Sequence, residues 1–223
     1  MGGPDRTVGL PYHLFYPILS SILLAIAGFS SADSVWYVSI NTQNEVIRFG
    51  SQNYCGYNVS NLITTNKLGC IFRGFQYQLP NNYFGFEIPN DINLNLSKVA
   101  LTSVISFGLV LFTGIHHAYT IRYSFRKNPI PNQDKLYTLS MIHFISVSIC
   151  FLLTWVAFIV QAAIIGHAVS QSNNIISNND NSQEIGNGVA IYWGQSVWLV
   201  LASAVIHFGW GYEAVRWRVA LLK

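Results

Sequence analysis

Long apolar stretches separated by polar segments dominate the chain. Four of these stretches contain no Asp, Glu, Lys or Arg, and each is long enough to cross a bilayer as a helix, which takes roughly 17–25 residues. A charged side chain at the centre of such a helix costs about 2.5–3.5 kcal/mol on insertion. The pattern therefore predicts an all-α bundle of four transmembrane helices, at residues 11–32, 99–120, 137–166 and 188–212.

The first and third stretches each differ from an ordinary span. The first has the position of a secretory signal peptide, but it lacks a basic leading region and its apolar core exceeds the usual ~7–15 residues. We therefore expect it to be retained as a helix. The third is longer than a bilayer requires, so we expect it to tilt or to project beyond one face.

The basic residues predict the orientation of the spans. Lys and Arg together number eight in residues 1–10, 121–136 and 213–223, against four in residues 33–98 and none in residues 167–187. Short loops rich in Lys and Arg remain on the cytoplasmic side. Both termini and the central linker are therefore expected to be cytoplasmic, and the other two loops extracellular.

The composition agrees with a membrane protein. Hydrophobic residues make up 51% of the chain and charged residues only 9%, whereas soluble domains carry about 25% charged residues. A net charge of +3 is too small to favour a nucleic-acid partner. The expected partner is therefore the lipid bilayer, together with other membrane proteins.

The loop of residues 33–98 is the only one large enough to fold by itself. It contains two β-prone runs, residues 35–40 and 45–49, with turn-forming residues between them. These runs predict a small antiparallel sheet on the outer membrane face. The loop of residues 167–187 is rich in Asn and Ser without an apolar period, so we expect it to be flexible.

Two cysteines, Cys55 and Cys70, lie in the large outer loop, and Cys150 lies within the third span. A pair on an oxidising face predicts a disulfide, with two free thiols as the alternative. Asn58 begins an Asn-Val-Ser sequon and is the expected glycosylation site. Asn95 begins a second sequon, which lies close to the membrane.

Together these features resemble the claudin-like four-span membrane proteins. That superfamily carries a Trp, a Gly-Leu-Trp element and two paired cysteines in its first outer loop. Ser51 departs from the aromatic residue expected in the animal claudins, and the surrounding sequence is more similar to the fungal PalI family. The residues that carry the resemblance are Trp36, Phe49, Gly50, Tyr54, Cys55, Cys70 and Tyr77.

The resemblance implies a non-enzymatic, fungal-type glycoprotein of the plasma membrane. It would organise a membrane domain or support a signalling receptor. Its partners would be that receptor or other copies of itself. The sequence itself contains no nucleotide-binding loop, zinc-protease motif or Gly-x-Ser-x-Gly element, and it predicts neither an enzyme nor a cofactor.

Histidines are the remaining candidates for chemistry. His117, His143 and His207 belong to stripes of small or polar residues spaced by three and four, which keeps each stripe on one helix face. Such faces pack against neighbouring helices in membranes. We therefore expect the three histidines to converge inside the bundle, where hydrogen bonding and packing would be their main role.

Other functions remain as alternatives. The same three histidines are candidate ligands of a haem or a metal ion, which would make the chain a membrane anchor for electron transfer, and proton sensing is a further hypothesis. A channel or transporter subunit is the last alternative. The absence of charged residues within the spans disfavours it.

Overall fold

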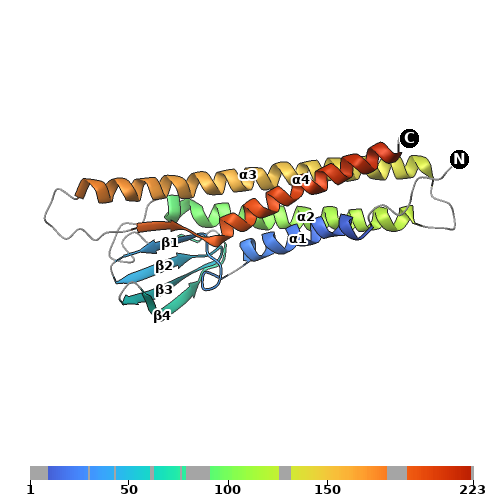
Figure 1. The fold of residues 1–223 in the computed structure, drawn as a ribbon. Coiled ribbons are helices and arrows are strands. Elements are labelled where there is room, and N and C mark those ends of the chain that lie inside the picture. Colours follow the sequence, from blue (N-terminus) through green and yellow to red (C-terminus); the bar gives the residue numbers. More distant parts are fainter. Residues whose placement is uncertain are drawn as a thin grey trace.

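Four long helices and one small sheet make up the described part of the chain. The helices are α1 (Leu10–Phe29), α2 (Ser97–Ser124), α3 (Gln133–Asn179) and α4 (Gln195–Leu221). They lie side by side, and each packs on two others in the order α1, α2, α3, α4 and back to α1 (Figure 1). The computed structural model describes residues 10–29, 31–42, 44–60, 63–75, 77–78, 91–125, 132–179 and 190–221.

The sheet contains five antiparallel strands, which confirms the small antiparallel sheet predicted from the sequence. Its spatial order is β4-β3-β2-β1-β5. Val38, Ile47 and Phe49 are buried on the face that packs towards the helices, whereas Ser39 and Arg48 belong to the opposite face. The strands are β1 (Val38–Asn41), β2 (Glu45–Phe49), β3 (Asn53–Ser60), β4 (Ile63–Phe72) and β5 (Ala190–Trp193).

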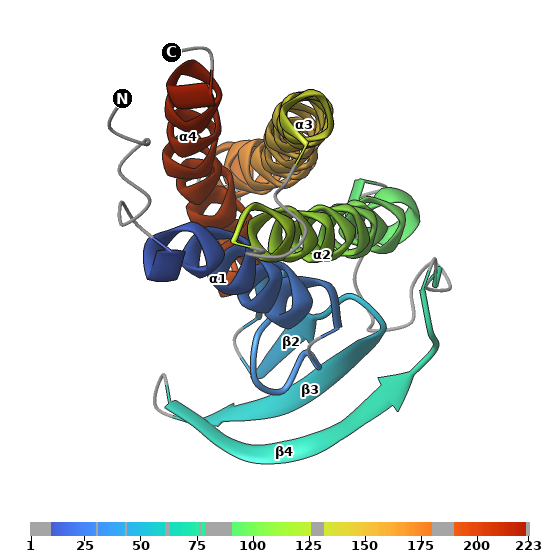
Figure 2. The ribbon, with the colours of Figure 1, turned by 90° about the vertical axis from the view of Figure 1, so that its right-hand side faces the viewer.

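The two ends of the bundle differ. The sheet lies at one end, called the sheet end below, and α1 begins and α4 ends at the opposite, distal end (Figure 1). Figure 2, viewed along the bundle, shows the sheet displaced to the side of α1, with β4 farthest from the helices. The helices therefore form an elongated body with an off-centre cap.

The expectation that residue 188 begins a helix is wrong, because Ala190–Trp193 is strand β5 and α4 begins at Gln195. Ile191 pairs with Ile40 of β1 and is buried, so this segment completes the sheet. Gly194 then turns the chain into α4, in a place where a Cβ would overlap the Trp36 carbonyl. Its N–H donates a hydrogen bond to the Tyr37 carbonyl at 2.8 Å, which fixes the start of the helix.

The expected end of the third span at Gly166 is also wrong. α3 continues to Asn179, so residues 167–179 of the expected flexible loop are helical, and the rest of that loop lies outside the described residues. No proline interrupts this segment, and Ala168 is buried beside the sheet. Helix η1, a π-helix (Asp91–Leu96) that precedes α2, also packs on α3. With 47 residues, α3 is about 70 Å long.

Two helical segments are long and apolar enough to cross a membrane by length and composition, residues 91–124 and residues 133–171. Residues 14–29 of α1 form a shorter apolar helix. Only 28% of the most apolar window is buried in each of the two longer segments. A core helix of a soluble protein would instead be mostly buried.

Large apolar side chains cover the outside of the bundle, and its inside contains many polar side chains beside a buried apolar cluster. Phe112, Ile115 and Leu152 are 70%, 63% and 60% exposed. Soluble proteins show the opposite distribution, with large apolar side chains buried. The buried polar side chains of the bundle include Ser20, Ser103, Ser106, Thr113, His117, His143, Thr154, Gln161, Ser203 and His207.

Candidate functional site

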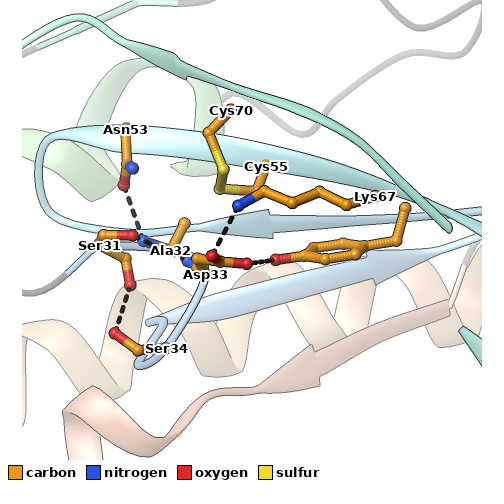
Figure 3. A network of polar contacts seen from close by, with 9 residues as sticks. Ser31, Ala32, Asp33, Ser34, Asn53, Cys55, Lys67 and Cys70 are labelled. Atoms are coloured by element: carbon orange, nitrogen blue, oxygen red, sulfur yellow. Dashed lines mark hydrogen bonds and ion pairs between the residues drawn. A yellow bond between two sulfur atoms is a disulfide. The ribbon is translucent and has the colours of Figure 1, made fainter.

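The predicted disulfide between Cys55 and Cys70 is present. The two residues are direct partners across β3 and β4, with their Cα atoms 4.1 Å apart (Figure 3). The bond therefore fastens the outermost strand of the sheet to its neighbour. Cys150 is a buried free cysteine on α3, and its sulfur lies 3.3 Å from the Thr113 hydroxyl of α2.

Asp33, in the turn after α1, connects that helix to the disulfide-linked strands. Its carboxylate accepts hydrogen bonds from the Tyr57 hydroxyl at 2.5 Å and from the Lys67 ammonium at 2.6 Å (Figure 3). These two donors, Lys67 above all, hold the pKa of Asp33 below its ordinary value. Desolvation and the neighbouring Asp33 carboxylate raise the pKa of Tyr57 to about 12. The network is a charge-assisted clamp on an exposed corner.

The same corner contains a group of atoms with the composition of a metal site. The Asp33 carboxylate and the sulfurs of Cys55 and Cys70 lie within 4.8 Å of one another. A cysteine binds a metal ion as its thiolate, and both sulfurs are bonded to each other here. The group is therefore not a metal centre in the oxidised protein.

Four residues that carry the family resemblance meet where the sheet joins the helices. The rings of Phe49 and Tyr54 lie 6.3 Å apart, and those of Tyr54 and Tyr77 lie 6.1 Å apart. The Tyr77 hydroxyl donates a hydrogen bond to the Gly50 carbonyl at 3.0 Å. A Cβ on Gly50 would come within 2.7 Å of the Ala32 nitrogen, so only glycine fits without a shift. These residues build the joint between α1 and the sheet.

Trp36 has a different role, on the opposite face of the sheet. The Arg48 guanidinium carbon lies 4.0 Å from the centre of the Trp36 ring and 4.6 Å from that of Tyr57. This places the cation between two aromatic faces, where each contact stabilises by about 0.5–2 kcal/mol. The sequence did not single out Arg48, because one arginine in a β-prone run has no distinguishing pattern.

A hydrogen-bonded chain links the sheet to the interior of the bundle. The Tyr37 hydroxyl lies 2.9 Å from the Ser103 hydroxyl of α2, and the Gln161 amide of α3 donates to that same hydroxyl at 2.9 Å. The Gln161 amide also donates a hydrogen bond to the Thr102 hydroxyl at 3.1 Å. By their spacing in the sequence, Thr102 lies on the same polar stripe as His117 and Gln161 on the same stripe as His143, but Tyr37 belongs to no such pattern.

The expected glycosylation site, Asn58, has an exposed side chain on β3. It stands opposite Glu45 of β2 and Asn66 of β4. The second sequon is less accessible, because Asn95 lies within η1 and Ser97 is buried with its hydroxyl bonded to the Tyr77 carbonyl. Asn58 therefore remains the predicted position for a glycan.

Two of the three singled-out histidines lie side by side within the bundle. The ring centres of His117 on α2 and His143 on α3 are 4.1 Å apart. Trp210 of α4 lies 6.1 Å from the first ring and 5.8 Å from the second, and its indole N–H donates to His117 Nδ1 at 3.2 Å. Three helices thus meet through one aromatic and imidazole cluster.

His207 contacts this cluster through Trp210, whose ring centre is 5.8 Å away. Its Nε2 lies 3.3 Å from the Ser20 hydroxyl of α1, which is 2.6 Å from the Ser203 hydroxyl of α4. The three histidines are therefore gathered around Trp210, each on a different helix. His167, by contrast, lies at the sheet end with its Nδ1 2.6 Å from an Asp91 carboxylate oxygen.

The arrangement is better suited to packing than to metal binding. Among the described residues, the Asp33 group is the only set of three or more ligand atoms within 4.8 Å, so the histidines do not converge their nitrogens on one point. Hydrogen bonds to Trp210 and Ser20 already use one nitrogen each of His117 and His207.

A scan against protein-family models finds no match for the chain, and a search of curated proteins finds no significant relative.

Proposed function

We propose that all four helices of the bundle cross a membrane and that the sheet lies on the outer side. The observation that supports this most is the inverted distribution of side chains, with large apolar residues outside and hydrogen-bonded polar residues inside. Polar contacts of this kind hold helices together in lipid, where the hydrophobic effect does not. The length of α3 also lets it project well beyond a bilayer core about 30 Å thick.

We further propose a non-enzymatic organising role of the PalI type at the plasma membrane. The bundle interior contains Leu24, Val110, Val147 and Trp210 in one buried cluster, so it is packed and lacks the character of a pore. Six of the seven residues that carry the family resemblance, all except Trp36, form the joint and the disulfide of the outer sheet. A rigid sheet fixed to a packed bundle is suited to holding a neighbouring membrane protein or a second copy.

Purification in native-membrane discs tests this role. We expect the full-length chain to be recovered with the same multi-pass protein, or with a second copy of itself, in a fixed ratio measured by mass spectrometry. The Cys55→Ser variant should lose that partner because its outer sheet is no longer fastened. Cys150→Ser is the matched control and should keep it. Recovery of the wild-type chain alone would contradict an organising role.

A further inference from the structure

A groove of about 290 Å³ opens on the face of the sheet that contains Ser39 and Arg48, opposite the face that packs towards the helices. Its walls come from β1, β2, β5 and the segment before β1, and they combine aromatic rings with a few polar groups. This combination is typical of small-ligand sites. The lining includes Trp36, Ser39, Asn41, Arg48, Tyr192 and Trp193.

Arg48 gives the groove its charge. Trp36 and Tyr57 hold the guanidinium between their rings, so its orientation is fixed before any ligand arrives. Its Nε is buried and has no hydrogen-bond partner. Within the described part of the chain, no carboxylate forms an ion pair with it, and Asp33 is already bound by Lys67 and Tyr57. A guanidinium that is held in place and forms no ion pair with a carboxylate of the described residues is suited to a phosphate or carboxylate.

With the membrane core taken to begin at the start of α4, the groove lies at or just above the lipid headgroups. Arg48 shares a row of the sheet with Ser39 and Tyr192, one residue from the row that contains Trp193. Since α4 begins at Gln195, Arg48 lies about 10 Å or less above the helix start, at ~3.3 Å per strand residue. The headgroup layer is about 5–8 Å thick on each side of the bilayer core.

The aromatic residues beside the groove agree with this height. Tyr192 is 53% exposed and Trp198 is 55% exposed, and the rings of Trp193 and Trp198 lie 6.0 Å apart. Exposed Trp and Tyr side chains gather at membrane–water interfaces. Below them, Val205 and Phe208 continue the exposed apolar face of α4. A ligand with a phosphate and acyl chains could therefore contact Arg48 and the apolar surface together.

We propose that this groove binds the phosphate of an anionic phospholipid from the outer leaflet, an inference that rests on the proposed membrane-spanning function. Arg48 binds the phosphate oxygens, Tyr192 and Trp193 flank the headgroup, and the acyl chains lie along α4. Acyl chains distinguish this ligand from free phosphate, because Trp193 of the groove contacts Trp198 on the apolar face of α4.

Native mass spectrometry of the purified full-length chain tests the proposal with three probes: dioctanoyl phosphatidic acid, dioctanoylglycerol and inorganic phosphate. We expect one tightly bound phosphatidic acid per chain and much weaker binding of the other two. Arg48→Gln should weaken phosphatidic acid binding about tenfold, as expected for a lost charge-assisted hydrogen bond. Arg73→Gln removes an exposed arginine outside the groove and should leave binding unchanged.

Several results would overturn the proposal. Binding of dioctanoylglycerol or inorganic phosphate as tight as that of phosphatidic acid would remove the phospholipid assignment, and so would an unchanged affinity in Arg48→Gln. If that variant does not fold, Tyr192→Ala decides, since this exposed side chain can be truncated without opening the core. The affinity of the Tyr192→Ala variant for phosphatidic acid must then fall. Liposome flotation of the same samples separates the two claims: a wild-type chain that does not float refutes the membrane-spanning function itself.

Discussion

The contacts of single residues indicate that the buried histidines serve packing and not cofactor binding. His117 and His143 touch each other and Trp210, and their positions at steps of three and four along polar stripes predicted an interior location. The stripes could not reveal Trp210, because a tryptophan in an apolar span has no distinguishing spacing. Tyr37 was missed because its partner Ser103 is distant in sequence, and Arg48 was missed because one arginine in a β-prone run has no distinguishing pattern.

Replacing one imidazole tests whether this cluster has a cofactor role. His143→Gln keeps a donor and an acceptor, so we expect a stability loss of only about 1 kcal/mol, the scale of hydrogen bonds within membranes. Absorption spectra of the purified wild type and variant should show no Soret band. His167→Gln, at the sheet end, is the control. A stoichiometric band that the His143 change abolishes would instead support the electron-transfer alternative.

At the scale of elements, the disulfide has the clearest expected effect. Cys55 and Cys70 are separated by 15 residues, and closing a loop of this size stabilises by about 3 kcal/mol in the chain-entropy model. A small sheet has little core of its own to offset that loss. Cys55→Ser or Cys70→Ser should therefore lower surface delivery, measured by surface biotinylation, and Cys150→Ser should not. Normal delivery with free thiols at both positions would contradict this role.

The elements also show how far the sequence could predict the fold. The length of the uncharged apolar stretches located the helices, and β-prone runs located β1 and β2. The same hydropathy placed Ala190–Trp193 inside a span, because a four-residue apolar strand and the start of an apolar helix look alike. Only the pairing of Ile191 with Ile40, which is distant in sequence, distinguishes the strand from the start of a helix. The helical continuation after Gly166 likewise depends on contacts with the sheet and η1.

The whole molecule is an elongated bundle with polar contacts inside, apolar side chains outside and one disulfide-bonded cap. The composition of the chain predicts a membrane protein, and the distribution of Lys and Arg predicts its orientation. The joint of Phe49, Gly50, Tyr54 and Tyr77 then explains how the cap is held on the bundle. The proposed topology requires both the connection between α2 and α3 and the end of α4 to face the cytoplasm.

Accessibility of single introduced cysteines to a membrane-impermeant maleimide, in intact cells and in a Cys150→Ser background, tests this topology most directly. All four positions tested are exposed: Asn44 directly precedes β2, Gln171 follows the sheet-packed Ala168 on α3, Gln133 begins α3, and Ala220 lies in the last turn of α4. We expect Asn44→Cys and Gln171→Cys to be labelled at once, and Gln133→Cys and Ala220→Cys only after permeabilisation. Labelling of all four positions in intact cells, or the reverse pattern, would contradict the proposed four-span topology.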